Sequence, residues 1–564
     1  MKQLIFGAVV VFVLIGCGGG GGSNEEEYHG GTDPDLFEAG DYNDSPLRSA
    51  ETKDDPLAVY QWHLNNFGQK AGRPTKATPP SSGNAGDLGV VDVWASGTKG
   101  AAAASVLAEG GSAITIGIVD SGVDQTHPDL APNWNESLSW SAKGGKIPYP
   151  YDTDPGCAHG TAVAGIAAAK GYDHVGVMGV APAAKWAGLN VGLGCGGYGG
   201  TTAVFANALY LPSRPLDIVS NSWGVSAPTS EPTLRDSIKA GITNGRGGKG
   251  TIYVFAAGNS RQDDDTGKEY HDNGNYHGEQ NSFYTISVAA LASNGTHTSY
   301  SNPGANVLVS AFGGDDPYII TTDIVGCGKG WDKRARMKHA LNTRCQYTHL
   351  MNGTSAATPM VSGVVALMLS KNPNLTWRDV RYILATTAKK TGAYIAGSST
   401  DDWKQNGANL HINHDYGFGA VNAQAAVNKA DGFTSLGTLI EVSCTLTGLS
   451  GSPIASGSTG KGGGYCSGSI GKIEFVGAKV KISGAPTSVK ADITLLHKGT
   501  DFVTDSVLAK SNQAINKALF ASGFTFGSVR HLDEPSSGDW NITITNLSSA
   551  EITVEDVNLT IYGH

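Results

Sequence analysis

The sequence predicts an α/β domain built on a doubly wound parallel sheet, followed by an all-β sandwich. The first prediction rests on short β-branched runs that alternate with helical segments, a pattern typical of parallel sheets flanked by helices. The second rests on a change of character near Phe433, where helical patterns stop and short alternating runs with Gly, Ser and Pro turns begin. With 564 residues the chain is too long for one hydrophobic core, so two or more domains are expected.

The strands and helices of both parts are expected at defined runs. In the α/β domain, strands are predicted at 114–119, 217–224, 251–259 and 285–290. Helices are predicted at 159–167, 233–244 and 361–369. In the sandwich, strands are predicted at 439–442, 479–482, 491–496, 541–545 and 558–562.

The bulk composition fits a globular protein rich in tight turns. The chain is 40% hydrophobic and 16% charged, and its 78 glycines follow no repeat, which excludes collagen. The formal net charge of −10 argues against nucleic acid as a partner, because phosphate binding needs a basic surface.

The N-terminus carries features of an exported protein. Residues 1–16 have one lysine followed by an apolar core, which predicts a signal peptide too short to span a membrane. Cys17 follows directly, and this junction resembles the lipobox of bacterial lipoproteins. The resemblance implies lipidation of Cys17 and a membrane-anchored lipoprotein in the periplasm or on the cell surface. Ordinary cleavage nearby is the alternative.

Composition divides the remaining chain into three parts. Residues 17–54 are Gly-rich and then acidic, which predicts a flexible tether. Residues 55–432 are expected to form the α/β domain, with 55–67 docking apolar side chains on its core. Residues 433–564 are expected to form the sandwich.

Without Cys17, an even number of cysteines remains. In an exported protein this predicts disulfides, although sequence alone does not select the pairing. Proximity along the chain favours Cys157 with Cys195, Cys327 with Cys345, and Cys444 with Cys466.

Four polar residues are candidates for a catalytic role, because each lies at the end of a predicted strand or at the start of a predicted helix. Asp120 ends the strand run 114–119, and ligands of open α/β sheets bind at the carboxyl ends of strands. Asn259 ends a second such run, and His159 begins a run of small residues. Ser355 follows Gly353 and precedes an apolar helix, so it is expected at a helix N-terminus, where anionic charge is favoured.

Each of these residues also has an ordinary structural interpretation. Asp120 could cap a helix, Asn259 could sit in a turn, and a lone histidine is more often structural than catalytic. Together they supply what acyl transfer requires: Ser355 as nucleophile, His159 as base, Asp120 to orient the imidazole, and Asn259 to stabilise an oxyanion.

The local motifs around these residues resemble those of the subtilisin-like serine peptidases. They are Asp120-Ser121-Gly122, His159-Gly160-Thr161, Ala257-Gly258-Asn259 and Gly353-Thr354-Ser355-Ala356. Finer matches at 60–64, 222–224 and 374–379 resemble the kexin/furin branch, and Gly538-Asp539-Trp540 is similar to the P domain that follows the catalytic domain there. The resemblance implies a subtilisin-like sheet, a jelly-roll-like P domain and a serine endopeptidase acting on proteins or peptides.

The resemblance also implies a calcium ion. The positions that match the ligands of this branch are Asp55, Asp129 and Asp173, with the carbonyl of Val175 as a further candidate. Several carboxylates with oxygen-only ligands suit Ca²⁺, whereas each aspartate alone could be a solvated loop residue. Asp152 and Asp154 resemble part of another acidic cluster, but the acid expected in the histidine helix is missing.

Specificity is where the chain departs from the branch. The resemblance implies that Ser222, Trp223 and Gly224 bind extended substrate and wall the S1 pocket, but the acidic run expected after them is replaced by 225–228. Asp272 or the run 263–265 could select a basic residue before the scissile bond, or could be a solvated loop.

Two further expectations remain. A pro-domain of the kind that usually assists folding in this branch is not expected in this sequence, which implies unaided folding or a separate folding chaperone. The alternative function is a cell-surface binding or adhesion protein on a protease scaffold, with the β domain as the binding module; this alternative predicts loss of a triad member, and none is lost from the sequence.

Overall fold

The computed structural model describes residues 55–70, 77, 86–99, 114–150, 155–195, 200–224, 228–262, 272–332, 342–392, 403–484, 487–510 and 514–564. The predicted signal peptide, Cys17 and the tether lie outside the described residues, as do Asp152, Asp154 and the acidic run 263–265. Within the described ranges, no helix has both the length and the apolar character needed to cross a membrane.

A seven-stranded parallel sheet forms the centre of the first part, in the order β2-β3-β1-β4-β5-β6-β7. Its strands are β1 Thr115–Asp120, β2 Trp140–Ser141, β3 Lys185–Asn190, β4 Ile218–Asn221, β5 Ile252–Ala256, β6 Thr285–Leu291 and β7 Val307–Phe312. All residues of β1, β4, β5 and β6 are buried, as expected for strands covered on both faces.

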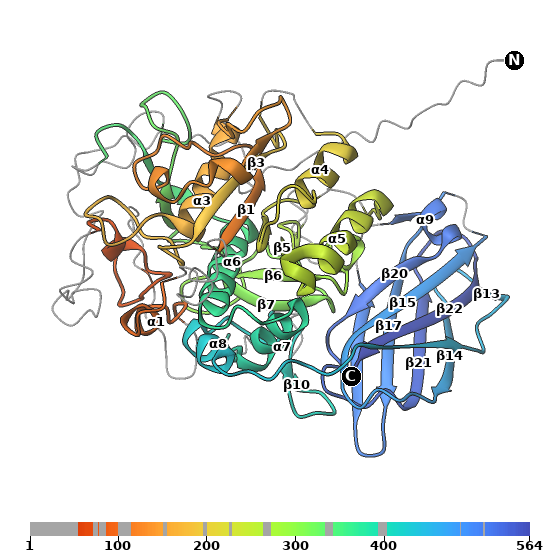
Figure 1. Ribbon diagram of the computed structural model, residues 1–564. Helices are drawn as coiled ribbons and strands as arrows, with labels where there is room; N and C mark the ends of the chain where they lie inside the picture. The colour runs from red at the N-terminus through yellow and green to blue at the C-terminus, as the bar shows by residue number, and fades with distance from the viewer. Residues whose placement is uncertain are drawn as a thin grey trace, which may run out of the picture.

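Helices flank this sheet in two groups (Figure 1): α4 packs against α5, and α6 packs against α3 and α8. The helices are α1 Val91–Ala95, α3 His159–Ala168, α4 Thr202–Leu209, α5 Pro232–Asn244, α6 Thr354–Lys371, α7 Trp377–Thr387 and α8 Ala423–Ala430. The short antiparallel strands β8 Ile319–Thr322 and β9 Tyr347–Met351 pair just before α6. The predicted doubly wound α/β class is confirmed.

The C-terminal part consists of antiparallel sheets, in the orders β12-β22-β15-β20, with β13 beside β22, and β14-β21-β17-β18. The strands are β12 Ile440–Leu446, β13 Ser452–Ile454, β14 Thr459–Cys466, β15 Ile473–Ser483, β17 Ala491–Lys498, β18 Val503–Ala509, β20 Phe524–Ser528, β21 Gly538–Asn546 and β22 Ile552–Gly563. The disulfide Cys444–Cys466 joins β12 of one sheet to β14 of the other. The predicted all-β C-terminal part is confirmed.

The two parts are packed together through shared apolar side chains. Phe283 of the first part stacks on Phe475 and Tyr562 of the second, with ring centroids 5.5 and 4.7 Å apart. Phe475 belongs to the larger hydrophobic cluster, which also contains the core of the α/β part, while Tyr276 of the α/β part lies in the cluster of the sandwich. The two cores therefore extend across the boundary.

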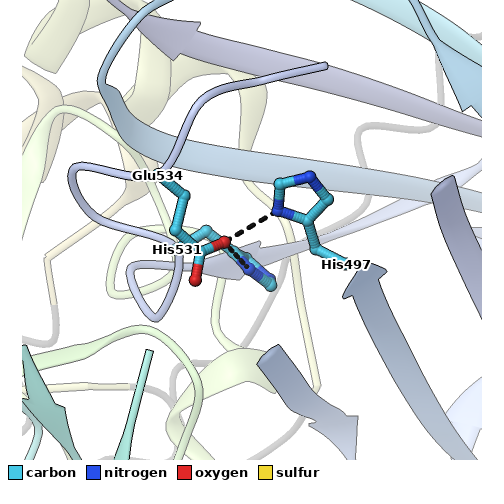
Figure 2. Close-up of side chains that lie close together, drawn as sticks. All are labelled: His497, His531 and Glu534. Carbon is cyan, nitrogen blue, oxygen red and sulfur yellow. Dashed lines mark hydrogen bonds and ion pairs between the residues drawn. The ribbon is translucent and has the colours of Figure 1, made fainter. Parts of the chain in front are cut away.

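A buried carboxylate reinforces this junction. Glu534 accepts hydrogen bonds at Oε1 from the backbone N–H of Gly407, at 2.7 Å, and from the hydroxyl of Thr504. The Nδ1 atoms of His497 and His531 lie 2.7 and 3.1 Å from its Oε2 (Figure 2). Gly407 lies between the short strands β10 Lys404–Gln405 and β11 His411–Ile412, so one carboxylate connects the α/β part to three points of the sandwich.

The electrostatics of Glu534 predict an acid-sensitive junction. Burial alone would raise its pKa, but the hydrogen bonds from His497 and His531 outweigh burial and lower the pKa from 4.5 to about 2. Since the folded-state pKa is the lower one, this contribution is present above about pH 4.5 and is lost as the pH falls toward 2.

We expect Glu534→Gln to lower the free energy of unfolding by about 3 kcal/mol near neutral pH, because an amide presents N–H groups to donors that need an acceptor. Urea unfolding at several pH values measures this change. The variant should also lose the part of the acid sensitivity that lies between pH 4.5 and 2. Glu551→Gln, at an exposed position of the same sandwich, is the matched control and should behave as the parent. Equal acid sensitivity in Glu534→Gln and the parent would contradict this account.

Candidate active site

Asp120 and His159 meet at the carboxyl edge of the central sheet. Asp120 is the last residue of β1, and His159 is the first residue of α3. Nδ1 of His159 lies 2.8 and 2.9 Å from the two carboxylate oxygens of Asp120. The Asp120 side chain is 1% exposed and that of His159 is 12% exposed, so the carboxylate is shielded while the imidazole reaches the surface.

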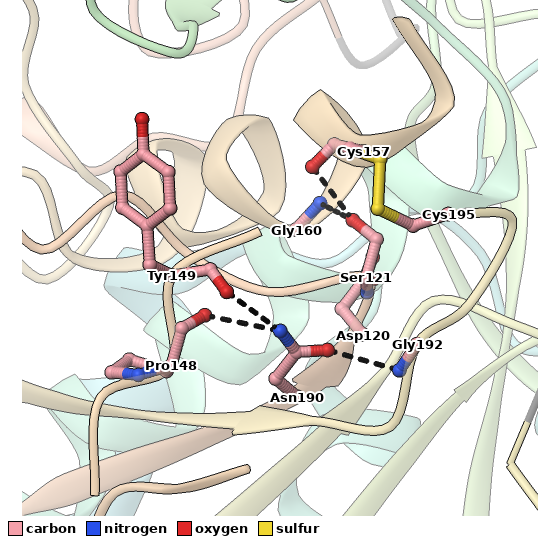
Figure 3. Close-up of a disulfide and its surroundings, with 9 residues drawn as sticks. All are labelled: Asp120, Ser121, Pro148, Tyr149, Cys157, Gly160, Asn190, Gly192 and Cys195. Atoms are coloured by element: carbon pink, nitrogen blue, oxygen red, sulfur yellow. Dashed lines mark hydrogen bonds between the residues drawn. A yellow bond between two sulfur atoms is a disulfide. The ribbon is translucent and has the colours of Figure 1, made fainter. Parts of the chain in front are cut away.

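Close contact between β1 and α3 depends on Gly160. A Cβ atom at this position would lie 2.2 Å from the carbonyl oxygen of Gly122 and 2.9 Å from Cβ of Asp120, so no larger residue fits. The hydroxyl of Ser121 fixes the same junction, because it accepts from the Gly160 N–H and donates to the Cys157 carbonyl, both at 3.0 Å (Figure 3).

The disulfide Cys157–Cys195 ties the turn before α3 to the loop after β3. Asn190, the last residue of β3, donates to the carbonyl of Tyr149 at 2.8 Å and accepts from the N–H of Gly192 at 2.9 Å. The disulfides Cys157–Cys195 and Cys327–Cys345, like Cys444–Cys466, are the pairs that proximity favoured, so the predicted pairing is confirmed.

Ser355 lies in the first turn of α6, which begins at Thr354 and includes Pro359. The helix therefore starts before the apolar run on which its prediction rested. Pro359 has no N–H, so the carbonyl of Ser355 loses its donor within the helix. The hydroxyl of Ser222 replaces that donor at 2.9 Å, and Ser355 Oγ donates to the carbonyl of Ser222 at 3.0 Å. This reciprocal pair anchors the start of α6 to the residue that follows β4.

Asn259 follows β5 and contacts the residue before Ser355. Its Oδ1 accepts from the N–H and the hydroxyl of Thr354, at 2.9 and 2.8 Å. This contact orients the amide so that its Nδ2 faces Gly353, where an added Cβ would lie 3.1 Å away. Gly353 also has a φ of +94°, a conformation that residues with a side chain rarely adopt.

The residues expected to bind substrate have distinct surroundings. The ring of Trp223 packs into the core against Phe205 and Phe255, with centroids 4.7 and 5.4 Å apart, so only its backbone is placed to face a substrate. Strand β4 ends at Asn221, earlier than predicted.

Asp272 is buried and accepts hydrogen bonds from protein groups. Its donors include the N–H of Asn273 at 2.8 Å and the Asn302 amide at 2.9 Å, and Nε2 of His277 lies 2.8 Å away. Asn302 in turn contacts both neighbours of Asn259: its N–H donates to Gly258, and its Oδ1 accepts from the N–H of Ser260. Asp272 is thus linked to the Asn259 turn and is not a solvated loop residue.

The expected calcium ligands lie around one loop. Asp55 accepts from the N–H groups of Tyr172 and Asp173, at 2.6 and 3.3 Å. Asp129 accepts from the Tyr347 hydroxyl at 3.0 Å, and the N–H of Val175 donates to Asp173 at 3.2 Å.

The pKa values of two of these carboxyls are raised. Burial raises the pKa of Asp129 to about 7 and of Asp55 to about 6, and the charge of Asp173 adds to both shifts. Two buried carboxyls beside a partly exposed third one that repels them are a donor set that a divalent cation would satisfy, so these residues fit Ca²⁺.

Sequence reasoning missed several residues that hold the site. Thr354 and Ser121 are part of the motifs that were recognised, but their roles depend on contacts between distant segments. Tyr300 gave no sequence signal; its hydroxyl accepts from the N–H of Gly353 at 3.0 Å and donates to the Gly314 carbonyl at 2.6 Å, which fixes the turn before Ser355.

Comparisons with known proteins agree with this geometry. A family model described as the subtilase family matches residues 111–419. The chain is 32% identical over 390 residues to neuroendocrine convertase 2 of Bos taurus, which covers 67% of this chain and 52% of that protein. It is 28% identical over 540 residues to furin of Rattus norvegicus, covering 90% of this chain and 58% of that protein. The chain thus spans about half the length of the curated relatives it matches.

Solved structures share the fold. The serine protease of Aeromonas sobria superposes with a TM-score of 0.77 at 24% identity, covering 92% of this chain and 98% of that chain. A complex of that protease with a chaperone superposes equally well, with a TM-score of 0.77 at 23% identity over 91% of this chain and 95% of that chain.

The contact between Gly353 and Asn259 can be tested by a pair of glycine variants. Gly353→Ala and Gly328→Ala both place alanine at a positive φ, +94° and +97°, but only the first brings Cβ close to another residue. We expect Gly353→Ala to lower the free energy of unfolding more than Gly328→Ala, by about 1 kcal/mol or more, because Asn259 must move. Equal losses in urea unfolding would show that the contact with Asn259 contributes nothing.

Proposed function

The chain belongs to the subtilase family, and from this premise we propose that it is an exported, calcium-dependent serine endopeptidase that uses Asp120, His159 and Ser355 as its triad. The observation that carries the proposal is the buried Asp120 carboxylate bonded to Nδ1 of His159 at 2.8 Å, at the sheet edge where α3 and α6 begin. Strands β1 and β4 are parallel neighbours, so Asp120 at the end of β1 and Ser222 after β4, which contacts Ser355, lie at the same edge of the sheet.

In the proposed reaction, His159 takes the proton from Ser355 Oγ as the hydroxyl attacks a peptide carbonyl. Asp120 holds the Nδ1–H tautomer and stabilises the imidazolium that forms. His159 then donates this proton to the leaving amine, which departs and leaves an acyl-enzyme on Ser355. In the second half of the reaction, His159 takes a proton from the attacking water and returns it to Ser355 Oγ as the acyl group is released. Ser355 Oγ must first leave the carbonyl of Ser222. Substrate binding can drive this change, because the hydrogen bond between a nucleophile and its catalytic base often becomes well aligned only in the complex with substrate.

Two donors are proposed for the oxyanion: Nδ2 of Asn259 and the backbone N–H of Ser355. Thr354 supports the first role, because its contacts with Oδ1 of Asn259 fix the orientation of the amide. The start of α6 adds the favourable field of a helix N-terminus. Extended substrate would pair with the backbone of Ser222, Trp223 and Gly224, and the last two would wall the S1 pocket.

Calcium is proposed at Asp55, Asp129 and Asp173, with the carbonyl of Val175 as a further ligand. The ion would neutralise the mutual repulsion of these carboxylates and stabilise the loop at 172–175. It takes no part in the chemical steps.

The remaining proposals concern location, domains and partners. We propose a lipid anchor on Cys17 after removal of residues 1–16, a tether at 17–54, a peptidase domain at 55–432 and a P domain at 433–564. A separate folding chaperone is proposed by analogy with the Aeromonas sobria protease, whose structure includes one.

Ser355→Ala should retain the parent's melting temperature and lower kcat by on the order of 10⁴- to 10⁶-fold, because the nucleophile is lost while the fold is kept. Peptide hydrolysis by both purified proteins measures this. Ser370→Ala, near the opposite end of α6, is the matched control and should keep the parent's rate. If Ser355→Ala cleaved at the parent's rate, Ser355 would not be the nucleophile. If a fluorophosphonate failed to label Ser355 in the parent, the adhesion-protein alternative would be favoured.

Calcium should raise the melting temperature of the parent, because an ion at 100 times its Kd stabilises a folded protein by about 2.7 kcal/mol. We expect Asp129→Asn to abolish most of this gain and to weaken Ca²⁺ binding in calorimetry. Asp236→Asn, an exposed position on α5, is the control and should respond as the parent. An unchanged gain in Asp129→Asn would place the ion elsewhere.

A preference for Lys or Arg before the scissile bond is proposed through Asp272. Matched peptides with Lys-Arg or Lys-Phe before that bond should differ in kcat/KM by about 10³, and Asp272→Asn should reduce this ratio. If Asp272→Asn instead slowed both peptides equally, Asp272 would act only by supporting Asn302 and the Asn259 turn. A ratio near one in the parent would refute the preference.

A further inference from the structure

The segment between β8 and β9 carries a tryptophan that lies against the proposed catalytic base. The rings of Trp331 and His159 meet edge to face, with centroids 6.3 Å apart and an angle of 83° between their planes. Trp331 is only partly buried, so its ring combines contact with the imidazole and contact with solvent.

A buried carboxylate fixes the turn that presents this ring. Asp323, fully buried directly after β8, accepts from the N–H of Ile324 at 2.7 Å and from the N–H of Asp332 at 2.8 Å. Gly330, with a φ of +60°, curves around the carboxylate so closely that a Cβ atom there would lie 2.0 Å from its Oδ1. The backbone on both sides of Trp331 is therefore held by one side chain.

Two disulfides support the same region. Cys327–Cys345 closes the segment that contains Trp331. Trp331 also packs against a buried apolar cluster formed by Ile324, Ala158 and the disulfide Cys157–Cys195. Because the cluster is buried, it supports the ring of Trp331, and the ring itself is the part that a substrate could contact.

On the premise of the proposed endopeptidase function, we propose that the ring of Trp331 forms the wall of a substrate subsite for an apolar side chain next to the scissile bond. His159 must contact both Ser355 and the leaving amine, so the substrate residues on either side of P1 pass the imidazole. A ring held against that imidazole is in reach of the P2 or the P1′ side chain. An apolar wall at this point discriminates for apolar side chains and against charged ones.

The test compares the parent, Trp331→Ala and Trp331→Phe on two series of peptides, one varying P2 and the other varying P1′ among Leu, Phe, Gly and Asp. We expect the parent to prefer Leu or Phe over Gly at one of these positions by about tenfold or more in kcat/KM. Trp331→Ala should lower the ratio of kcat/KM for the Leu or Phe peptide to that for the Gly peptide to near one, and Trp331→Phe should keep most of the parent's ratio. The series that responds identifies the position.

Controls separate a subsite from a structural role. Tyr465→Ala, an exposed aromatic residue on β14 that is 68% exposed, should leave both series unchanged. A loss in Trp331→Ala that is equal for Leu and Gly peptides, or a parent without preference at either position, would overturn the subsite. A parent that is not labelled by fluorophosphonate and cleaves no peptide would overturn the proposed function itself, and this outcome is recognisable before any variant is made.

Discussion

The reciprocal contact between Ser222 and Ser355 is the interaction on which the geometry of the site depends. It exists because Pro359 removes a helical hydrogen bond, so the carbonyl of Ser355 requires an outside donor. Ser222 supplies that donor only because it directly follows β4 at the carboxyl edge of the sheet. The start of α6 and the residue after β4 are thereby fixed relative to each other.

Around this contact, the site is assembled by close approaches between backbone segments. Gly160 brings α3 onto β1 and so places His159 on Asp120, while Gly353 brings the start of α6 onto Asn259. Buried side chains complete the arrangement: Ser121 joins β1 to the turn before α3, and Thr354 orients the amide of Asn259. These contacts hold the backbone around the site in place, and such preorganisation favours electrostatic stabilisation of a transition state.

Much of the fold could be predicted from sequence because β1, β4, β5 and β6 are short apolar runs. Runs of this length and composition are typical of strands that are buried on both faces of a parallel sheet. Strand β3 was not predicted because it contains no β-branched residue. Strand β14 was not predicted because its glycines disfavour a strand, although pairing with β21 stabilises one there. The candidate residues Asp120, His159, Asn259 and Ser355 stood in short motifs. Contacts such as those of Tyr300, Asn302 and Trp331 join residues far apart in sequence, and no local pattern encodes them.

We propose that Nδ2 of Asn259 and the backbone N–H of Ser355 face the same point, where the oxyanion would form. A crystal structure of the protein inactivated by a peptidyl phosphonate tests it most directly. The account predicts a covalent bond from Ser355 Oγ to phosphorus, with the phosphoryl oxygen about 2.7–3.1 Å from Asn259 Nδ2 and from the Ser355 N–H, and with the ring of His159 still on Asp120. An adduct on another residue, or a phosphoryl oxygen directed away from Asn259, would contradict it.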